Sequence, residues 1–532
     1  MRVVTLTLLI AVLAWAQVPS PIAIVHTYVG FSGPNPPDAG STSADMMGGV
    51  NAKFLVGFTN RGLGIWSKAD GRLIQPVQTQ MEFWTAAFKN ADTAVTGKPY
   101  DPRIAFDPMT SRWFASANTN INGLSDHVFL AVSADDDPTH PWKAVEYKTP
   151  MTVDNLKLGF DKFGVYSAAL SGRADPSPIS VPVMAIPKTD LLWKGDGKPG
   201  LSHLNLFEVP AGGRMSDHKY SGVEGMVPAF DLNPHKKATD PEIYVNRYRQ
   251  QIDGETILQI RRLTWSSPEK ATLSEPISIG LGMHYAVQPS TLGIQPDLPG
   301  GLVSPGIRAG EARIVDAVVK NGDLWTIAAA EVNQRDGAFW VQIDLHTMKL
   351  VQHGTLTDPN GDILFPSLNV DDRGNLGIGM SRTSHDEALS IYVTGRLASD
   401  PPNTLRPLVR AVQGHFVHYR KDIDLTKPGQ SVSWSDYSTV VTDPSDPSLF
   451  WTFQEATTNE TMPKENADSY GTHWVAWRSA APLQPKNATS GIVEGFDKYP
   501  VVALAETTHA VSEFHVFCRS GLPSHGRRQG VP

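Results

Sequence analysis

Short apolar runs that alternate with polar residues recur along most of the chain. Each run ends in an Asp-containing turn, and a second run rich in aromatic and small residues follows the turn. This alternation is typical of half-buried β-strands, whereas the i, i+3, i+4 apolar spacing of amphipathic helices is nearly absent. The clearest copies are residues 103–107 with 112–115, 157–161 with 163–166, 367–371 with 376–379, and 439–443 with 449–451.

Three weaker copies extend the series, namely 227–231 with 243–245, 314–319 with 324–325, and 50–58 with 64–66. The copies lie roughly 50 to 85 residues apart, which is the spacing of four-stranded propeller blades with long loops. We therefore predict an all-β fold, a single β-propeller of seven four-stranded blades over residues 45–480. An array of β-sandwiches is the alternative, but it does not explain an Asp at one fixed place in each unit.

The segments that flank the predicted propeller differ from it. Residues 17–44 are expected to form an extended segment that shares in closing the last blade, and residues 481–532 form a poorly patterned C-terminal tail. Residues 1–16 resemble a secretory signal peptide, with Arg2, an apolar run over 3–13 and the small-x-small sequence 14–16. A buried N-terminal strand is the alternative. We expect an extracellular or periplasmic protein.

Charge and composition narrow the classes of partner. Lys and Arg number 46 and Asp and Glu 54, giving a net charge of −8 without long runs of one sign, so a nucleic-acid groove is not expected. No stretch after the signal reaches the ~18 consecutive apolar residues of a membrane span. The single cysteine, Cys518, allows no intramolecular disulfide. We expect a monomer.

The Asp residues at the repeat turns have a structural interpretation. An Asp followed closely by Gly, Pro or Asn forms a tight turn, because its carboxylate accepts backbone N–H groups. The residues concerned are Asp107, Asp161, Asp371 and Asp443. We therefore interpret them as turn-forming residues rather than as a site.

Several segments resemble a largely uncharacterised group of secreted bacterial β-propeller proteins, loosely similar to sialidase and BNR-repeat propellers. The resemblance implies the propeller fold and export, and it supplies no catalytic residues. This chain departs from the group at Ser433, where the group usually has a basic residue, and residues 481–532 do not resemble the group. The segments that carry it are 49–54 with 64–71, 101–107 with 112–113, 130–142, 157–159, 392–400 and 434–438.

Strand alternation suggests a ring of polar side chains around the central channel. Residues four before each turn Asp share its face, which places Arg103, Lys157, Ser367 and Thr439 at equivalent positions of the innermost strands. By the same count, other polar residues lie nearer the entrance where these strands begin, and this mouth suits an anionic or hydroxyl-rich ligand. These residues are Asp101, Asn155 and Tyr437, with Trp434 and Asp436 close by. The alternative is that Arg103 pairs with a carboxylate of the neighbouring blade and joins the two blades.

The predicted function is the binding, and as a further step the cleavage, of an extracellular glycan or similar polar ligand at this mouth. For a glycoside hydrolase, Asp101 and Asp436 are the candidate catalytic carboxylates, because such enzymes need a pair about 5 to 9.5 Å apart. A polysaccharide lyase would instead need a base such as His284 or Tyr285. The alternative is a non-enzymatic protein-interaction scaffold, which the long loops of residues 289–310 favour.

Cofactor sites are not expected. The sequence shows no zinc-ligand spacing, no phosphate-binding glycine loop and no Gly-x-Ser-x-Gly elbow. The acidic run at residues 135–137 has the oxygen ligands that Ca²⁺ prefers, but such runs are more commonly solvated turns.

Overall fold

The fold is known from a computed structural model. It describes residues 22–32, 44–121, 124–150, 152–171, 180–210, 223–252, 254–285, 292–309, 313–420, 423–458 and 471–479. The predicted signal peptide, the C-terminal tail and Cys518 lie outside these residues. No helix in the described ranges is long and apolar enough to cross a membrane.

Most strands belong to antiparallel meanders in which consecutive strands pair. The first three meanders run as follows: β2 (Met47–Val50), β3 (Phe54–Thr59) and β4 (Gly62–Ser67); β5 (Lys98–Asp107), β6 (Arg112–Ile121), β7 (Leu124–Ser133) and β8 (Trp142–Lys148); β9 (Val153–Phe160), β10 (Gly164–Ser171), β11 (Ser180–Pro187) and β12 (Asn205–Pro210).

The middle of the chain continues in the same way. Its meanders are β13 (Val223–Pro228), β15 (Glu242–Ile252), β16 (Glu255–Ser267) and β17 (Lys270–Leu273), with β18 (Ile277–Gly280) also on β16; and β20 (Ile314–Lys320), β21 (Asp323–Val332), β22 (Arg335–Asp344) and β23 (Lys349–Leu356).

The last meanders are β24 (Asp362–Val370), β25 (Leu376–Thr383), β26 (Ser390–Arg396) and β27 (Val409–Val412), then β29 (Thr439–Asp443), β30 (Asp446–Glu455) and β31 (Thr472–Arg478). Strand β1 (Ala23–Val29) pairs with β31 from Ala23 and Arg478 to Val29 and His473. The expected part of the N-terminal segment in closing the last blade is therefore confirmed.

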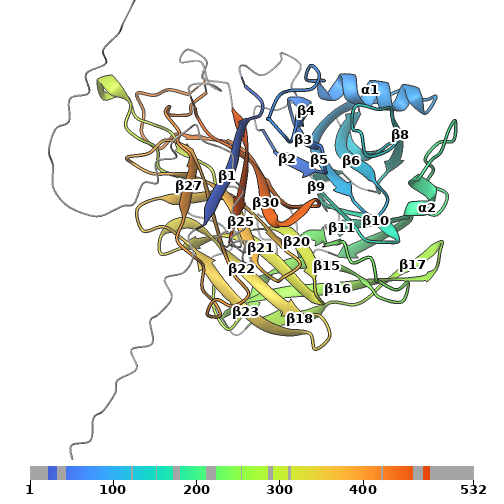
Figure 1. The fold of residues 1–532 in the computed structure, drawn as a ribbon. Coiled ribbons are helices and arrows are strands. Elements are labelled where there is room, and N and C mark those ends of the chain that lie inside the picture. The colour runs from blue at the N-terminus through green and yellow to red at the C-terminus, as the bar shows by residue number, and fades with distance from the viewer. Residues whose placement is uncertain are drawn as a thin grey trace, which may run out of the picture. The chain divides into compact units, whose positions relative to one another are not determined.

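The innermost strands form a ring around a central channel. Each first strand contacts the first strand of the next meander, in the order β2, β5, β9, β13, β20, β24 and β29, and β29 contacts β2. Figure 1 labels β2, β5, β9 and β20 of this ring, and β30 of the last meander lies near β2. The all-β propeller is thus confirmed. The exact blade number stays a prediction, because the short strand β14 (Phe230–Asp231) joins two meanders into one nine-stranded sheet.

One predicted repeat, in the first meander, is wrong. The segment 50–58 is not an innermost strand, because β2 ends at Val50 and β3 returns over Phe54–Thr59. Asn51 takes the place of the turn Asp, and its Oδ1 accepts the backbone N–H groups of Lys53 and Phe54 at 2.8 Å. This meander has three strands, followed by helix α1 (Gln80–Asn90), which buries Phe83 and Trp84. A capping box between Thr79 and Glu82 starts the helix.

Gly48 lets β2 approach the last blade closely. A Cβ atom at this position would lie 2.4 Å from Cη2 of Trp474, whose ring is stacked on Phe453 with centroids 4.6 Å apart. Only a residue without a side chain fits here. Aromatic side chains therefore fill the wedge between the last blade and the first.

The turn Asp residues have the predicted role. In each case Oδ1 accepts the backbone N–H two residues further on, at 2.8 to 3.0 Å, as expected of an Asx turn. These contacts are Asp107 with Met109, Asp161 with Phe163, Asp371 with Arg373, and Asp443 with Ser445.

Three of these carboxylates also bind a lysine of the following blade. The nitrogen–oxygen distances are 2.6 Å for Lys188 with Asp107, 2.8 Å for Lys236 with Asp161, and 2.9 Å for Lys68 with Asp443. Lys188 belongs to the short helix α2 (Lys188–Leu191) after β11, and Lys68 follows β4. The turn carboxylates therefore fix each turn and join neighbouring blades.

Replacing Lys188 by Met is expected to lower the free energy of unfolding by about 3 to 5 kcal/mol, because the buried Asp107 carboxylate loses its cation. The matched control is Lys320→Met. Its partner Asp372 is 64% exposed, and the loss there is expected to be about 1 kcal/mol or less. Denaturant unfolding of both variants measures the difference. Equal losses would contradict a stabilising role for the buried pair.

Candidate functional site

A backbone irregularity recurs in the innermost strands, six residues before the turn residue. The residue there has a positive φ of 48 to 56° in five blades. Asp, Asn and Gly adopt this left-handed conformation more readily than other residues, so the backbone itself explains four of the five residue types. The residues are Asp45, Asp101, Asn155, Gly225 and Phe365.

The irregularity interrupts strand alternation. In β5 the pairing with β6 shifts between Tyr100 and Arg103, and in β24 the pairing with β25 shifts between Leu364 and Ser367. Beyond this bulge, residues counted back in steps of two from the turn no longer lie on the same face of the strand. The predicted common face of Asp101 with Arg103 does not follow from the sequence.

Hydrogen bonds link these residues around the entrance end of the channel, where the innermost strands begin. The Asp45 carboxylate accepts the backbone N–H of Asp436 at 2.9 Å and the Nδ2 group of Asn60 at 2.5 Å. The Asn60 Oδ1 atom accepts the N–H of Asp101 at 2.9 Å. The Asp101 carboxylate in turn accepts the N–H of Asn155 at 3.1 Å. The acidic side chains thus bind backbone groups of adjacent blades.

Arg103 lies below this hydrogen-bonded rim and bridges several blades. Its Nε donates to the carbonyl of Leu156 at 2.5 Å, and its Nη2 donates to Oδ1 of Asn155 at 2.8 Å. Its Cζ lies 3.2 Å from the ring centroid of Tyr437, and the Lys157 Nζ lies 5.4 Å from the same centroid. Arg103 is only 3% exposed. It joins blades as the structural alternative expected, through a carbonyl and an amide instead of a carboxylate.

Burial dominates the electrostatics of the channel. It raises the pKa of Asp101 well above its ordinary value, with added repulsion from Asp45, Asp154 and Asp436 and a partial opposing effect of Arg103. Burial also lowers the pKa of Lys157 well below its usual range, with repulsion from Arg103 next in size. Burial thus disfavours the charged forms of both Asp101 and Lys157.

The predicted site residues separate into two groups. The structure brings together Asp101, Arg103, Asn155, Lys157 and Tyr437, all buried, at the entrance end.

Asp436 and Trp434 lie differently. Asp436 is exposed, and its backbone joins the hydrogen-bonded rim through Asp45. Trp434 is 1% exposed, and its ring lies edge-on to His418 with centroids 4.1 Å apart. The catalytic and ligand-binding roles assigned to these seven residues stay predictions.

Two other candidates lie away from the channel centre. Tyr285 packs face to face on Phe339 with ring centroids 4.3 Å apart, and burial raises its pKa to about 12. In the acidic run 135–137, Asp135 accepts the backbone N–H of Asp137 and contacts His140 at 2.8 Å. Among the described residues, no three His, Cys, Asp or Glu side chains are placed to hold a metal ion.

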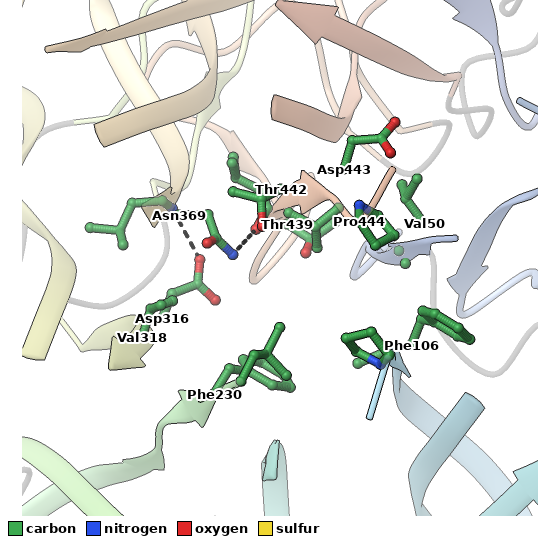
Figure 2. Close-up of a pocket in the computed structure, with 18 of the residues that line it drawn as sticks. Val50, Phe106, Phe230, Asp316, Val318, Asn369, Thr439, Thr442, Asp443 and Pro444 are labelled. Atoms are coloured by element: carbon green, nitrogen blue, oxygen red, sulfur yellow. Dashed lines mark hydrogen bonds between the residues drawn. The ribbon is translucent and has the colours of Figure 1, made fainter. Parts of the chain in front are cut away.

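Sequence reasoning missed a cavity of about 230 Å³ on the channel axis. It extends to the turn end, since Pro108, Lys320, Asp372 and Pro444 line it, and strands from around the ring contribute to its walls (Figure 2). We call it the turn-end pocket. Its other lining residues used below are Met47, Phe106, Phe160, Phe230, Asp316, Val318, Leu368, Asn369, Thr439 and Thr442.

The repeats did carry a signal for the pocket. Phe106, Phe160 and Phe230 each directly precede a turn Asp, in the sequences Ala-Phe-Asp, Gly-Phe-Asp and Ala-Phe-Asp. All three line the pocket. The recurrence of Phe before the turn Asp does not by itself show that these rings face a cavity on the axis.

Comparisons with known proteins find the fold alone. No family model matches the chain, and no curated protein is similar to it in sequence. Similar solved structures include the α-L-arabinofuranosidase Arb93A from Fusarium graminearum, at 10% identity over 70% of this chain and 91% of that chain, with a TM-score of 0.36. The Dos1 propeller is 8% identical over 87% of this chain and 96% of that chain, with a TM-score of 0.36. Trypanosoma rangeli sialidase is 10% identical over 72% of this chain and 55% of that chain, with a TM-score of 0.31. These identities and scores carry no information on the activity of this chain.

Arg103→Ala is expected to lower the free energy of unfolding by about 2 to 6 kcal/mol. The substitution leaves the buried Leu156 carbonyl and Asn155 amide oxygen without donors, at about 1 to 3 kcal/mol each. Asp436→Asn, on an exposed side chain, is the control and should change stability by less than about 1 kcal/mol. Thermal and denaturant unfolding measure both. An unchanged stability of Arg103→Ala would favour a ligand-binding role.

Glu455 gives a pH-dependent prediction. It is fully buried, and neither carboxylate oxygen has a hydrogen-bond partner among the described residues. Burial, with the nearby Asp45, raises its pKa well above the ordinary value of 4.5. The folded protein therefore holds this proton more tightly than the unfolded chain does. The resulting stability is fully present below the ordinary pKa and is lost as pH rises through the folded-state pKa.

Glu455→Gln removes this titration. The stability of the variant relative to the wild type should therefore increase as pH rises above the ordinary pKa of 4.5 and level off above the folded-state pKa, as measured by urea unfolding at each pH. Glu275→Gln, on a side chain that is 98% exposed, is the matched control and should show no such trend. A difference between Glu455→Gln and the wild type that does not vary with pH would refute the assignment.

Proposed function

We propose that this protein is an exported β-propeller that binds a glycan or a similarly hydroxyl-rich ligand in the turn-end pocket. The observation that supports this is the pairing of half-buried aromatic rings with a few polar groups on the channel axis. Ligand pockets are mostly apolar with a small number of placed polar groups. A sugar ring matches such a lining, because it has C–H faces and hydroxyl edges.

The aromatic part of the lining is held in place by neighbouring rings. Phe230 stands edge-on to Phe160, with centroids 5.1 Å apart and planes at 83°. Phe106 packs at a tilt against Trp113, with ring centroids 4.9 Å apart. Phe230 and Phe106 are each partly exposed, so a ring face remains available to a ligand. Rigid aromatic surfaces of this kind provide contact area at low cost in conformational entropy.

The polar part of the lining comes from β20, β24 and β29. One oxygen of Asp316 accepts the N–H of Leu368 at 3.2 Å and the hydroxyl of Ser367. Figure 2 shows this carboxylate beside the open space, with Asn369 next to it and Thr442 beyond Asn369. Burial raises the pKa of Asp316, while the Ser367 hydrogen bond and the Lys157 charge oppose the shift. Asp316 is therefore the main acceptor that a ligand hydroxyl would meet.

A glycan array probed with the purified protein tests binding, and variants then test the pocket. Phe230→Ala and Asp316→Asn should each weaken binding to the array-positive glycan about tenfold or more, equal to about 1.4 kcal/mol. The matched controls are Phe163→Ala, on a half-buried ring, and Asp196→Asn, on an exposed side chain, both outside the pocket lining. Calorimetry measures the affinities. No binding to any glycan would favour the protein-interaction scaffold instead.

Cleavage of a glycan at the entrance end, at a site separate from the turn-end pocket, is a second candidate function, supported by the carboxylates there. Asp101, whose pKa is raised, is surrounded by Asp45, Asp154 and Asp436. Glycosidases pair a carboxylic acid of raised pKa with a second carboxylate that acts as base or nucleophile. In this proposal Asp101 is the acid and Asp436 the second carboxylate.

Product release from array-positive glycans tests cleavage. Asp101→Asn and Asp436→Asn should each reduce release at least a hundredfold, the lower end of what a positioned general acid contributes. Binding in the turn-end pocket should stay unchanged in both variants. Release that persists in both variants would exclude these carboxylates as the catalytic pair.

A further inference from the structure

The turn-end pocket does not continue through the propeller. Its innermost lining residues along the strands include Met47, Asp316 and Thr439, which hold the position of Arg103, four residues before the end of the innermost strand or the turn, in β2, β20 and β29. Met47 is 5% exposed, and its Sδ lies 3.3 Å from Nη1 of Arg103. The residues at the floor therefore rest on the Arg103 layer.

Side chains at the depth of the floor fill the rest of the channel. The Arg103 guanidinium packs on the Tyr437 ring at 3.2 Å, and Lys157 faces the same ring. Ser367 closes the other side through its bond to Asp316. Arg103, Lys157, Ser367 and Tyr437 are each more than nine-tenths buried. No ligand chain can pass between them while this packing holds.

The closing layer is also fixed to its surroundings. Arg103 is bonded to Leu156 and Asn155 of the next blade, and the Tyr437 hydroxyl donates to the Pro102 carbonyl at 3.1 Å. Opening a passage would break several buried hydrogen bonds that join different blades, each at about 1 to 3 kcal/mol. The pocket is therefore a blind well with a single opening at the turn end.

The size of the well limits what enters it. Its volume of about 230 Å³ is below the range of about 300 to 1,000 Å³ that encloses drug-sized ligands. A single sugar ring is the unit that suits this volume. The acceptor of the lining, Asp316, lies at the deep end, whereas the rim holds the ion pair of Lys320 with Asp372 and the prolines Pro108 and Pro444.

We propose that the turn-end pocket recognises the terminal residue of a glycan chain, bound end-on, and rejects internal residues. This inference rests on the proposed function and adds the class of ligand, namely chain ends. An internal residue carries a chain on both sides, and a well with one opening leaves no path for the second. The terminal residue enters with its free hydroxyls toward Asp316.

The test uses the array-positive polysaccharide, intact and after partial acid hydrolysis to chains about ten times shorter. Both preparations compete at equal mass with an immobilised sample of the same polysaccharide. End-on recognition predicts that the shorter chains compete about tenfold more strongly, because they carry about ten times more ends. In Asp316→Asn, both preparations should compete more weakly by the same factor. Competition that is unchanged or weaker for the shorter chains would overturn the proposal.

A matched pair of α-glucans gives a second measurement when the array-positive glycan is an α-1,4-glucan. Maltoheptaose and β-cyclodextrin contain the same seven glucose units, and only the linear compound has ends. Maltoheptaose should bind, and the ring should not; equal binding would overturn end recognition. A protein that binds no glycan on the array overturns the proposed function itself, which distinguishes that failure from glycan binding without dependence on chain ends.

Discussion

The propeller depends on the carboxylates at the turns of its innermost strands, each of which makes two kinds of contact. Asp107, Asp161 and Asp443 accept backbone N–H groups of their own turn and bind a lysine of the following blade. A blade has two faces and cannot bury both alone, so its stability depends on the adjacent blades. A contact that fixes local geometry and attaches the next blade meets both needs with one side chain.

The two ends of the channel consequently differ. At the entrance end, Asp45 and Asp101, both in the left-handed conformation, accept backbone N–H groups of adjacent blades, and Arg103 with Tyr437 fills the axis below them. At the turn end, the polar groups of the turns are already bound to other groups, and the aromatic residues that precede them line the turn-end pocket. Closing the channel at one end thus leaves a pocket at the other.

The sequence predicts the repeating units because alternation and turn chemistry are local. It fails for β2, where Met-Gly-Gly-Val shows no alternation and Asn51 replaces Asp. It identifies Asp101, Asn155 and Tyr437 as polar residues near the axis. Their burial and partners depend on the bulge at Asp101 and Asn155, which a count of alternating positions does not reveal. The turn-end pocket arises from segments hundreds of residues apart, so its existence lies beyond any local pattern.

The pairing of β1 with β31 has a consequence for the order of folding. Ala23 pairs with Arg478, so the last blade lacks its outer strand until nearly the whole described chain is available. Closing so long a loop costs little more entropy than closing one half its length, about 0.6 kcal/mol per doubling. Until β31 has formed, however, β1 and the edge of the last blade present unpaired backbone groups, which are sites for aggregation. Ring closure therefore covers the edge of β31 and leaves β1, from the other end of the described chain, as the outer strand of the last blade.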